Sequence, residues 1–223
     1  MLRKTHNIKK KLIIEDKNEL YGLLAVLSVF SLITANILAF KQEDFGILVL
    51  SSGTLLFPLS YIVDDILAEC YGFWKARKVI YLGFLMNLIF VIYCYVVLAL
   101  PYPAYFTGQD AMSMVLGFTP VLLVASFSAY VVGSLANAGT VSFMKNHKSL
   151  NNSLFGRLFL STVIGQGLDA FIFTFIAFGW YLPLFDTLYM AVSVYLFKVA
   201  VEFVCYPITK RLINFIKKEY DID

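Results

Sequence analysis

Two oppositely charged residues lie deep inside the last two apolar segments of the sequence. Asp169 and Lys198 are each about a dozen residues from one end of their segment, a depth of about 17–18 Å at 1.5 Å per residue. An isolated charge at the centre of a bilayer costs roughly 3 kcal/mol even on lenient insertion scales, so such residues usually face a partner or a water-filled cavity. We therefore expect Asp169 and Lys198 to meet near the midplane and to belong to a binding site.

Further polar side chains inside the apolar segments extend this candidate site. Glu202 follows Lys198 by four residues and therefore occupies the same helical face. The other candidate substrate-binding residues are Gln166, Asp64, Asp65, Asn36 and Asn137. A structural tie between the last two helices is the alternative interpretation of Asp169, Lys198 and Glu202. Interhelical polar contacts in membranes contribute only about 0.6 kcal/mol on average, which favours a site.

The same segments contain little that is typical of catalysis. Both histidines, His6 and His147, fall outside the apolar segments, and no G-x-x-x-x-G-K-[ST] motif is present. We therefore expect no metal or other cofactor and no ATP hydrolysis by this chain. An enzyme acting on lipid is the least favoured class, because no serine has a histidine base within a segment.

The elements that position these residues are predicted to be transmembrane helices. Hydrophobic residues make up 60% of the 223 residues and charged residues only 15%, so lipid is the natural solvent for the chain. Apolar runs of the length needed to cross about 30 Å of hydrocarbon occur six times. They predict an all-α integral membrane protein with six transmembrane helices at about 20–40, 45–68, 79–100, 118–143, 158–180 and 187–209.

The basic residues predict the orientation of these helices. Sixteen of the 18 Lys and Arg residues lie before the first, between the second and third, between the fourth and fifth, or after the sixth segment. By the positive-inside rule both termini are cytoplasmic. The predicted organisation is a basic cytoplasmic segment at 1–19, a transmembrane domain at 20–213 and a cytoplasmic tail at 214–223. A charge distribution of this kind is a topology signal and indicates no nucleic-acid partner.

Two segments are expected to depart from regular helix. Pro58 frees a backbone carbonyl and follows Ser51, Ser52 and Gly53, so the second span is the most easily interrupted one, as expected where a span lines a cavity. The proline- and aromatic-rich connection at 101–113 is a candidate for a small lid.

Four stretches carry a resemblance to a known family. They are PLSYIVDDILAECYG (58–72), SFSAYVVGSLAN (126–137), RLFLSTVIGQGLDAFIFTFIAF (157–178) and YLFKVAVEFVCYPITK (195–210). In order and spacing the chain resembles the queuosine precursor transporter family, also called the vitamin uptake transporter family. Related proteins often have Thr-Asp followed by Arg in the second span, where this chain has Val63, Asp64 and Glu69, and often Asn in place of Gln166.

The resemblance implies a six-helix fold similar to the S components of vitamin importers. It implies uptake of 7-cyano-7-deazaguanine or 7-aminomethyl-7-deazaguanine across a bacterial inner membrane. A carboxylate such as Asp169 or Glu202 suits the N1–H and 2-amino donors of a deazaguanine, and Lys198 or Gln166 suits its 6-oxo group. Phe171, Phe173 and Tyr195 are candidates for stacking. Two mechanisms stay open: a self-sufficient importer, with or without a coupling ion, and an S-component-like binding subunit for another small vitamin or nucleobase that needs an energising partner.

Overall fold

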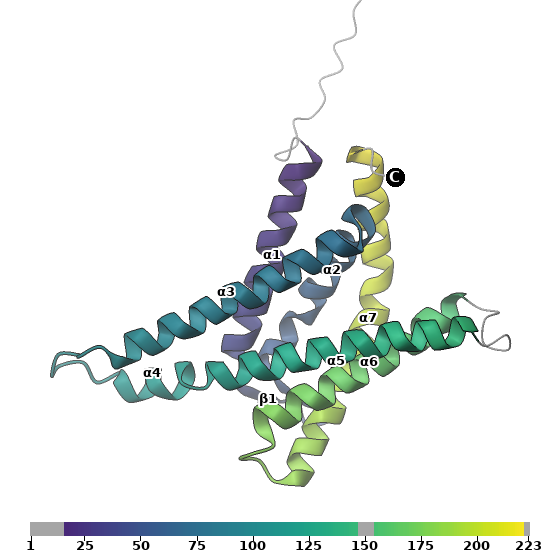
Figure 1. Ribbon diagram of the computed structural model, residues 1–223. Coiled ribbons are helices and arrows are strands. Elements are labelled where there is room, and N and C mark those ends of the chain that lie inside the picture. Colours follow the sequence, from purple (N-terminus) through teal and green to yellow (C-terminus); the bar gives the residue numbers. More distant parts are fainter. Residues whose placement is uncertain (1–15, 147–153, 221–223) are drawn as a thin grey trace, which may run out of the picture.

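The computed structural model describes residues 16–146 and 154–220, and most of these residues are helical (Figure 1). The helices are α1 (Lys17–Leu38), α2 (Phe57–Tyr71), α3 (Phe73–Ala99), α4 (Gln109–Leu116), α5 (Thr119–Asn146), α6 (Leu154–Phe178) and α7 (Leu184–Tyr220). Most of the predicted segment 1–19, the end of the predicted tail and part of the connection before α6 lie outside the described residues.

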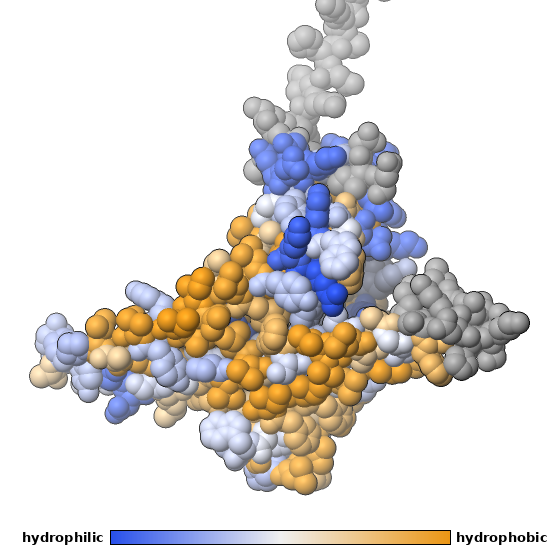
Figure 2. Space-filling model, in the orientation of Figure 1, coloured by the Kyte–Doolittle hydropathy of each residue, from blue (hydrophilic) through white to orange (hydrophobic). Residues whose placement is uncertain are grey.

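The exposed surface of the helices is that of an all-α membrane protein, as predicted. Among the described residues, five helical segments are long and apolar enough to cross a membrane. Large apolar side chains on them face outward, for example Val26, Ile92 and Phe203. Figure 2 shows hydrophilic residues gathered at the end where α1 begins and α7 ends, with a broad apolar surface below.

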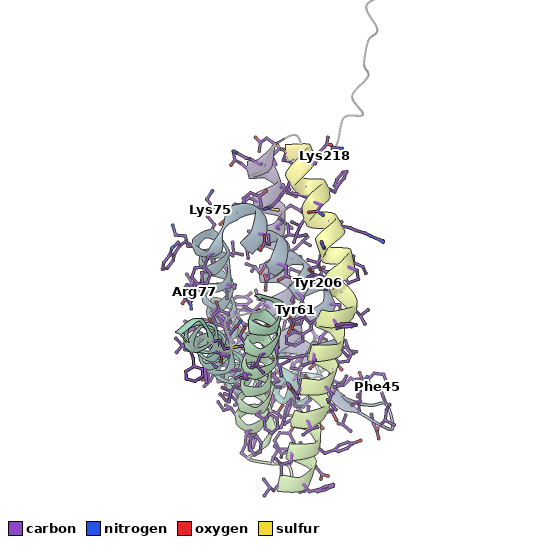
Figure 3. The ribbon with its side chains drawn as sticks, turned by 90° about the vertical axis from the view of Figure 1, so that its right-hand side faces the viewer. Phe45, Tyr61, Lys75, Arg77, Tyr206 and Lys218 are labelled. Atoms are coloured by element: carbon purple, nitrogen blue, oxygen red, sulfur yellow. The ribbon has the colours of Figure 1, made fainter. Side chains whose placement is uncertain are left out.

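Both described chain ends lie at this hydrophilic end. Lys75, at the start of α3, and Lys218, in the last turn of α7, lie toward it, whereas Phe45 lies near the opposite end (Figure 3). Helices α1 and α7 therefore run in opposite directions between the same two ends, which places the N-terminal and C-terminal helix ends side by side (Figure 1).

The prediction of a helix over 45–68 is wrong for its first half. Residues 42–51 form an antiparallel hairpin of β1 (Gln42–Asp44) and β2 (Val49–Ser51), in which Gln42 pairs with Ser51. A short 3-10 helix, η1 (Ser52–Leu56), follows, and α2 begins only at Phe57. Residues within the turn itself stabilise the hairpin turn: Gly46 has a positive φ of 80°, and its N–H donates to Asp44 Oδ1 at 2.7 Å.

The expected interruption of the second span is found between β2 and α2. Gly53 of η1 packs directly on α1: a Cβ at this position would lie 2.1 Å from the carbonyl oxygen of Ala35. Pro58 occupies the first turn of α2, where a proline costs no helical hydrogen bond. The chain therefore crosses this part of the molecule as a hairpin, a 3-10 turn and a 15-residue helix.

Two apolar clusters pack the two ends of the molecule. One contains Leu50, Leu122 and Phe178 near the hairpin, and the other contains Leu24 and Leu67 toward the end that holds the termini. Between the clusters, the close approach of α5 and α6 is permitted by two glycines. A Cβ on Gly133 would lie 2.9 Å from the Gly165 carbonyl oxygen, and one on Gly165 would lie 3.0 Å from that of Gly133.

The connection at 101–113 is partly helical, because α4 begins inside it. Gln109 Nε2 donates to the Leu98 carbonyl at 3.1 Å and so ties α4 to the end of α3. On the same side of the molecule, Gln42 Nε2 donates to the Tyr181 hydroxyl at 2.8 Å and joins the hairpin to the connection between α6 and α7.

Candidate functional site

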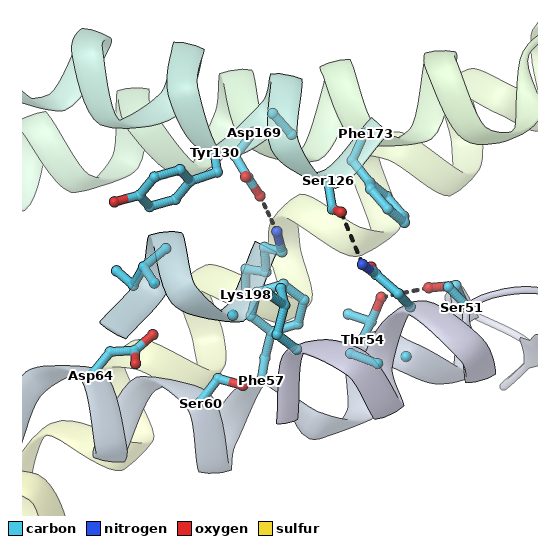
Figure 4. A pocket seen from close by; sticks show the side chains of 18 of the residues that line it. Ser51, Thr54, Phe57, Ser60, Asp64, Ser126, Tyr130, Asp169, Phe173 and Lys198 are labelled. Atoms are coloured by element: carbon cyan, nitrogen blue, oxygen red, sulfur yellow. Dashed lines mark hydrogen bonds and ion pairs between the residues drawn. The ribbon is translucent and has the colours of Figure 1, made fainter. Parts of the chain in front are cut away.

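A cavity of about 180 Å³ lies between the two apolar clusters. Along α1 and the residue after it the lining runs from Ser28 to Ala39, and β2, η1, α2, α3, α5, α6 and α7 supply the remaining walls. Ligand pockets for drug-sized molecules are typically about 300–1,000 Å³, so this volume suits a ligand of one or two rings. Its walls are mostly apolar, and the polar side chains fall into three groups (Figure 4).

The middle group is the pair that the sequence predicts. The Lys198 ammonium donates to Asp169 Oδ2 and lies over the Phe57 ring, 3.9 Å from its centroid. Lys198 is only 2% exposed, so its charge is neutralised within the protein rather than by solvent. Asp169 is more accessible, and within the described residues Oδ1 accepts no hydrogen bond.

The local sequence fixes where the Asp169 carboxylate lies. A Cβ on Gly133 would lie 3.1 Å from the Asp169 Cβ, so the glycine lets α5 approach the base of this side chain. Asp169 follows Gly165 by one helical turn, and both lie on the face of α6 that meets α5. The carboxylate thus extends from a closely packed helix pair into the cavity.

A neutral polar group lies on the hairpin side of the ion pair. Asn36 Nδ2 donates to Ser126 Oγ at 3.1 Å, and the hydroxyls of Ser51 and Thr54 are 2.9 Å apart. Phe173 faces them across the cavity (Figure 4). This end therefore offers hydroxyl and amide groups beside one aromatic ring.

A third group lies at the other end of the cavity. Asp64 of α2 accepts a hydrogen bond from Ser28 Oγ at 2.9 Å; Ser60 lies one helical turn before it, and Tyr130 comes from the facing wall of the cavity (Figure 4). Asp64 and Asp169 are thus carboxylates of one cavity, on opposite sides of Lys198 in this view.

Four of the predicted residues do not line this cavity. Gln166, Asp65 and Glu202 surround the buried Tyr61 hydroxyl instead, and Glu202 is also close to Thr162. Asn137 packs in the interface of α5 and α6, where a Cβ on Gly165 would lie 3.1 Å from the Asn137 Cβ. Lys198 therefore pairs with Asp169 across two helices, and its neighbour Glu202, one turn away, faces a separate polar cluster.

Several lining residues were not predicted from the sequence, above all Phe57, Ser28, Ser60 and Tyr130. A signal for Ser28 does exist in the first span. Small and polar residues recur at helical spacing through Ser28, Ala35, Asn36 and Ala39, which is the pattern of a helix face that lines a cavity. Phe57 carries no such signal, because its role depends on the break of the second span.

Comparison with known proteins finds similarity to transporters. A family model described as "Putative vitamin uptake transporter" matches residues 51–212. A "Probable queuosine precursor transporter" of Bacillus subtilis (strain 168) is 29% identical over 180 residues, which cover 80% of this chain and 78% of that protein. No solved structure matches the chain.

Proposed function

Because the chain belongs to the vitamin uptake transporter family, we propose that it imports a queuosine precursor, 7-cyano-7-deazaguanine or 7-aminomethyl-7-deazaguanine, across a bacterial inner membrane. The chain is a transporter and not an enzyme. In the proposed orientation both termini are cytoplasmic, since sixteen of the 18 Lys and Arg residues fall in the four segments assigned to that side, among them Lys75 and Lys218 (Figure 3).

The observation that carries the proposal is the Asp169–Lys198 pair in the cavity. A deazaguanine presents an N1–H and a 2-amino donor next to a 6-oxo acceptor. Asp169 Oδ1 can accept hydrogen bonds from the N1–H and 2-amino donors, and the Lys198 ammonium has further protons to donate to the 6-oxo group. A neutral guanine-like edge that brings both donors and an acceptor satisfies the pair without adding a charge to it.

The shape and lining of the cavity support a flat heterocycle. Phe57 and Phe173 provide aromatic faces on which a purine-like plane can stack. The amide of Asn36 and the hydroxyls of Ser51 and Thr54 complete the polar lining at the hairpin end.

The test measures queuosine in the tRNA of a bacterial strain that cannot make the precursors and lacks its own transporter. The strain is fed each deazapurine and expresses the unchanged chain, Asp169→Asn, Lys198→Met or Glu69→Gln. Glu69 is the matched control, because this exposed carboxylate of α2 lies outside the cavity, 3.9 Å from Lys217. We expect the first two variants to lose uptake at equal expression and Glu69→Gln to keep it.

The same strain decides whether the chain needs an energising partner. Uptake that persists after deletion of the energising modules of vitamin importers supports a self-sufficient importer. Loss of uptake in that background supports the S-component-like alternative. Replacing sodium in the medium and collapsing the proton gradient then identify any coupling ion.

A further inference from the structure

The cavity has an excess negative charge. Three charged side chains line it: Asp169, Lys198 and Asp64. The first two form an ion pair and compensate each other. Among the described residues, Asp64 has a single polar partner, the neutral Ser28 hydroxyl, and no basic side chain within ion-pair distance.

The basic residue on the facing part of α3 is engaged elsewhere. Arg77 donates from Nη2 to Ser134 Oγ at 3.2 Å, and its guanidinium lies 4.9 Å from the centroid of the Phe73 ring. Arg77 approaches Tyr130 but does not line the cavity. The next acidic residue along α2, Asp65, adds a further negative charge near Asp64 rather than a compensating one.

A carboxylate withdrawn from water is stabilised most by a cation that also donates hydrogen bonds to it. On the basis of the proposed function, we propose that the Asp64 end of the cavity is a subsite for an ammonium group of the ligand. Of the two queuosine precursors, only the aminomethyl base carries such a group, since an aliphatic amine keeps its proton at neutral pH whereas a nitrile is uncharged. The site therefore prefers 7-aminomethyl-7-deazaguanine to 7-cyano-7-deazaguanine.

The arrangement of the three polar groups fits a ligand bound in this direction. The guanine-like edge contacts Asp169 and Lys198, and the aminomethyl arm extends toward Asp64 along the cavity (Figure 4). Ser60 lies one helical turn before Asp64 in α2 and offers a hydroxyl oxygen as a further acceptor for the ammonium protons. A cyano group at the same place meets a carboxylate that it cannot neutralise.

The experiment measures uptake of each base into proteoliposomes that contain the purified full-length chain, at pH 7. The chains compared are the unchanged protein, Asp64→Asn, Asp64→Glu and Glu69→Gln. Asp64→Asn keeps an oxygen that accepts from Ser28 but removes the charge, so folding is retained, and Asp64→Glu restores the charge. We expect Asp64→Asn to lower the kcat/KM for the aminomethyl base about tenfold or more and to lower that for the cyano base by a clearly smaller factor.

The outcomes separate this inference from the proposed function. Recovery of the aminomethyl preference in Asp64→Glu and its retention in Glu69→Gln support an ammonium subsite. If Asp64→Asn lowers the uptake of both bases equally, the ammonium subsite is overturned, while the proposed transport function still stands. A loss of cyano-base uptake in Asp64→Asn that depends on sodium or on the proton gradient also overturns the inference, because Asp64 then binds a coupling ion. If the unchanged chain transports neither base, the proposed function fails first.

Discussion

Removing one or both members of the Asp169–Lys198 pair distinguishes a binding site from a structural tie. In Asp169→Asn the Lys198 ammonium, 2% exposed, loses its carboxylate; the neutral amide oxygen of the new asparagine and the Phe57 ring stay beside it, but no anion does among the described residues. Breaking a buried ion pair by removing one partner costs about 3–5 kcal/mol. The Phe57 ring already lies over the ammonium in the unchanged chain, so it offsets little of this cost.

We therefore expect Asp169→Asn to destabilise the protein by about 3 kcal/mol, which lowers the midpoint of thermal unfolding by about 6–12 °C for a chain of this size. Lys198→Met leaves the Asp169 carboxylate, which is partly open to the cavity, so we expect this variant to lose less stability than Asp169→Asn. The double variant Asp169→Asn with Lys198→Met removes both charges, and we expect it to recover most of the stability of the unchanged chain.

The assay pairs thermal unfolding in lipid nanodiscs with uptake of deazapurine in proteoliposomes from the same preparation. For a binding site, the double variant is stable but does not transport, because it offers the ligand neither an anionic acceptor nor a cationic donor. Recovery of both stability and uptake in the double variant would refute the reasoning and identify the pair as a structural tie between α6 and α7.

Two further predictions concern the break in the second span and the ring beneath Lys198. Gly53→Ala places a methyl group 2.1 Å from the Ala35 carbonyl oxygen, so we expect thermal unfolding to show a destabilisation of at least about 1–3 kcal/mol. The control Gly139→Ala, with nothing within 4 Å of its new Cβ, should leave the stability unchanged. Equal effects of the two changes contradict the tight contact at Gly53. Phe57→Leu keeps an apolar side chain but removes the aromatic face beside Lys198. We expect calorimetry to show ligand binding weaker by about 0.5–2 kcal/mol. An unchanged affinity means that the Phe57 ring contributes packing alone.

The common depth of Asp169 and Lys198 was predictable because it depends only on the constant rise of a helix. Once two antiparallel spans are placed in a bilayer, counting residues from their ends gives the depth of each side chain. What counting does not give is the rotation of each helix about its axis. Glu202 shares a face with Lys198 in sequence, yet it lies beside Thr162 and Tyr61, outside the cavity. Asn36 and Asp64 line the cavity, whereas Asn137 packs against Gly165.

Hydropathy also predicted the wrong structure for residues 45–56. The run from Phe45 to Leu50 is as apolar as a span, but its residues have different environments: Ile47 is 82% exposed at the hairpin tip, and Leu50 is 1% exposed in the apolar cluster near the hairpin. Mean hydropathy averages over such differences. The local signals that oppose a helix are Asp44 and Gly46, which form the turn, and the small polar residues that follow β2.

The place where hydropathy fails is also where the cavity is built. Irregular backbone at membrane depth is stable only where it is buried in protein or lines a cavity, because its polar groups find no partner in lipid. Ser51 and Thr54 bond to each other, Gly53 lies against α1, and all three line the cavity together with Phe57. A continuous second helix in this place would break the close contact of Gly53 with α1 and move Phe57 away from Lys198. The interrupted span and the charged pair are therefore parts of one site, and a change that restores helix across 51–56 should abolish transport even though it increases the regularity of the fold.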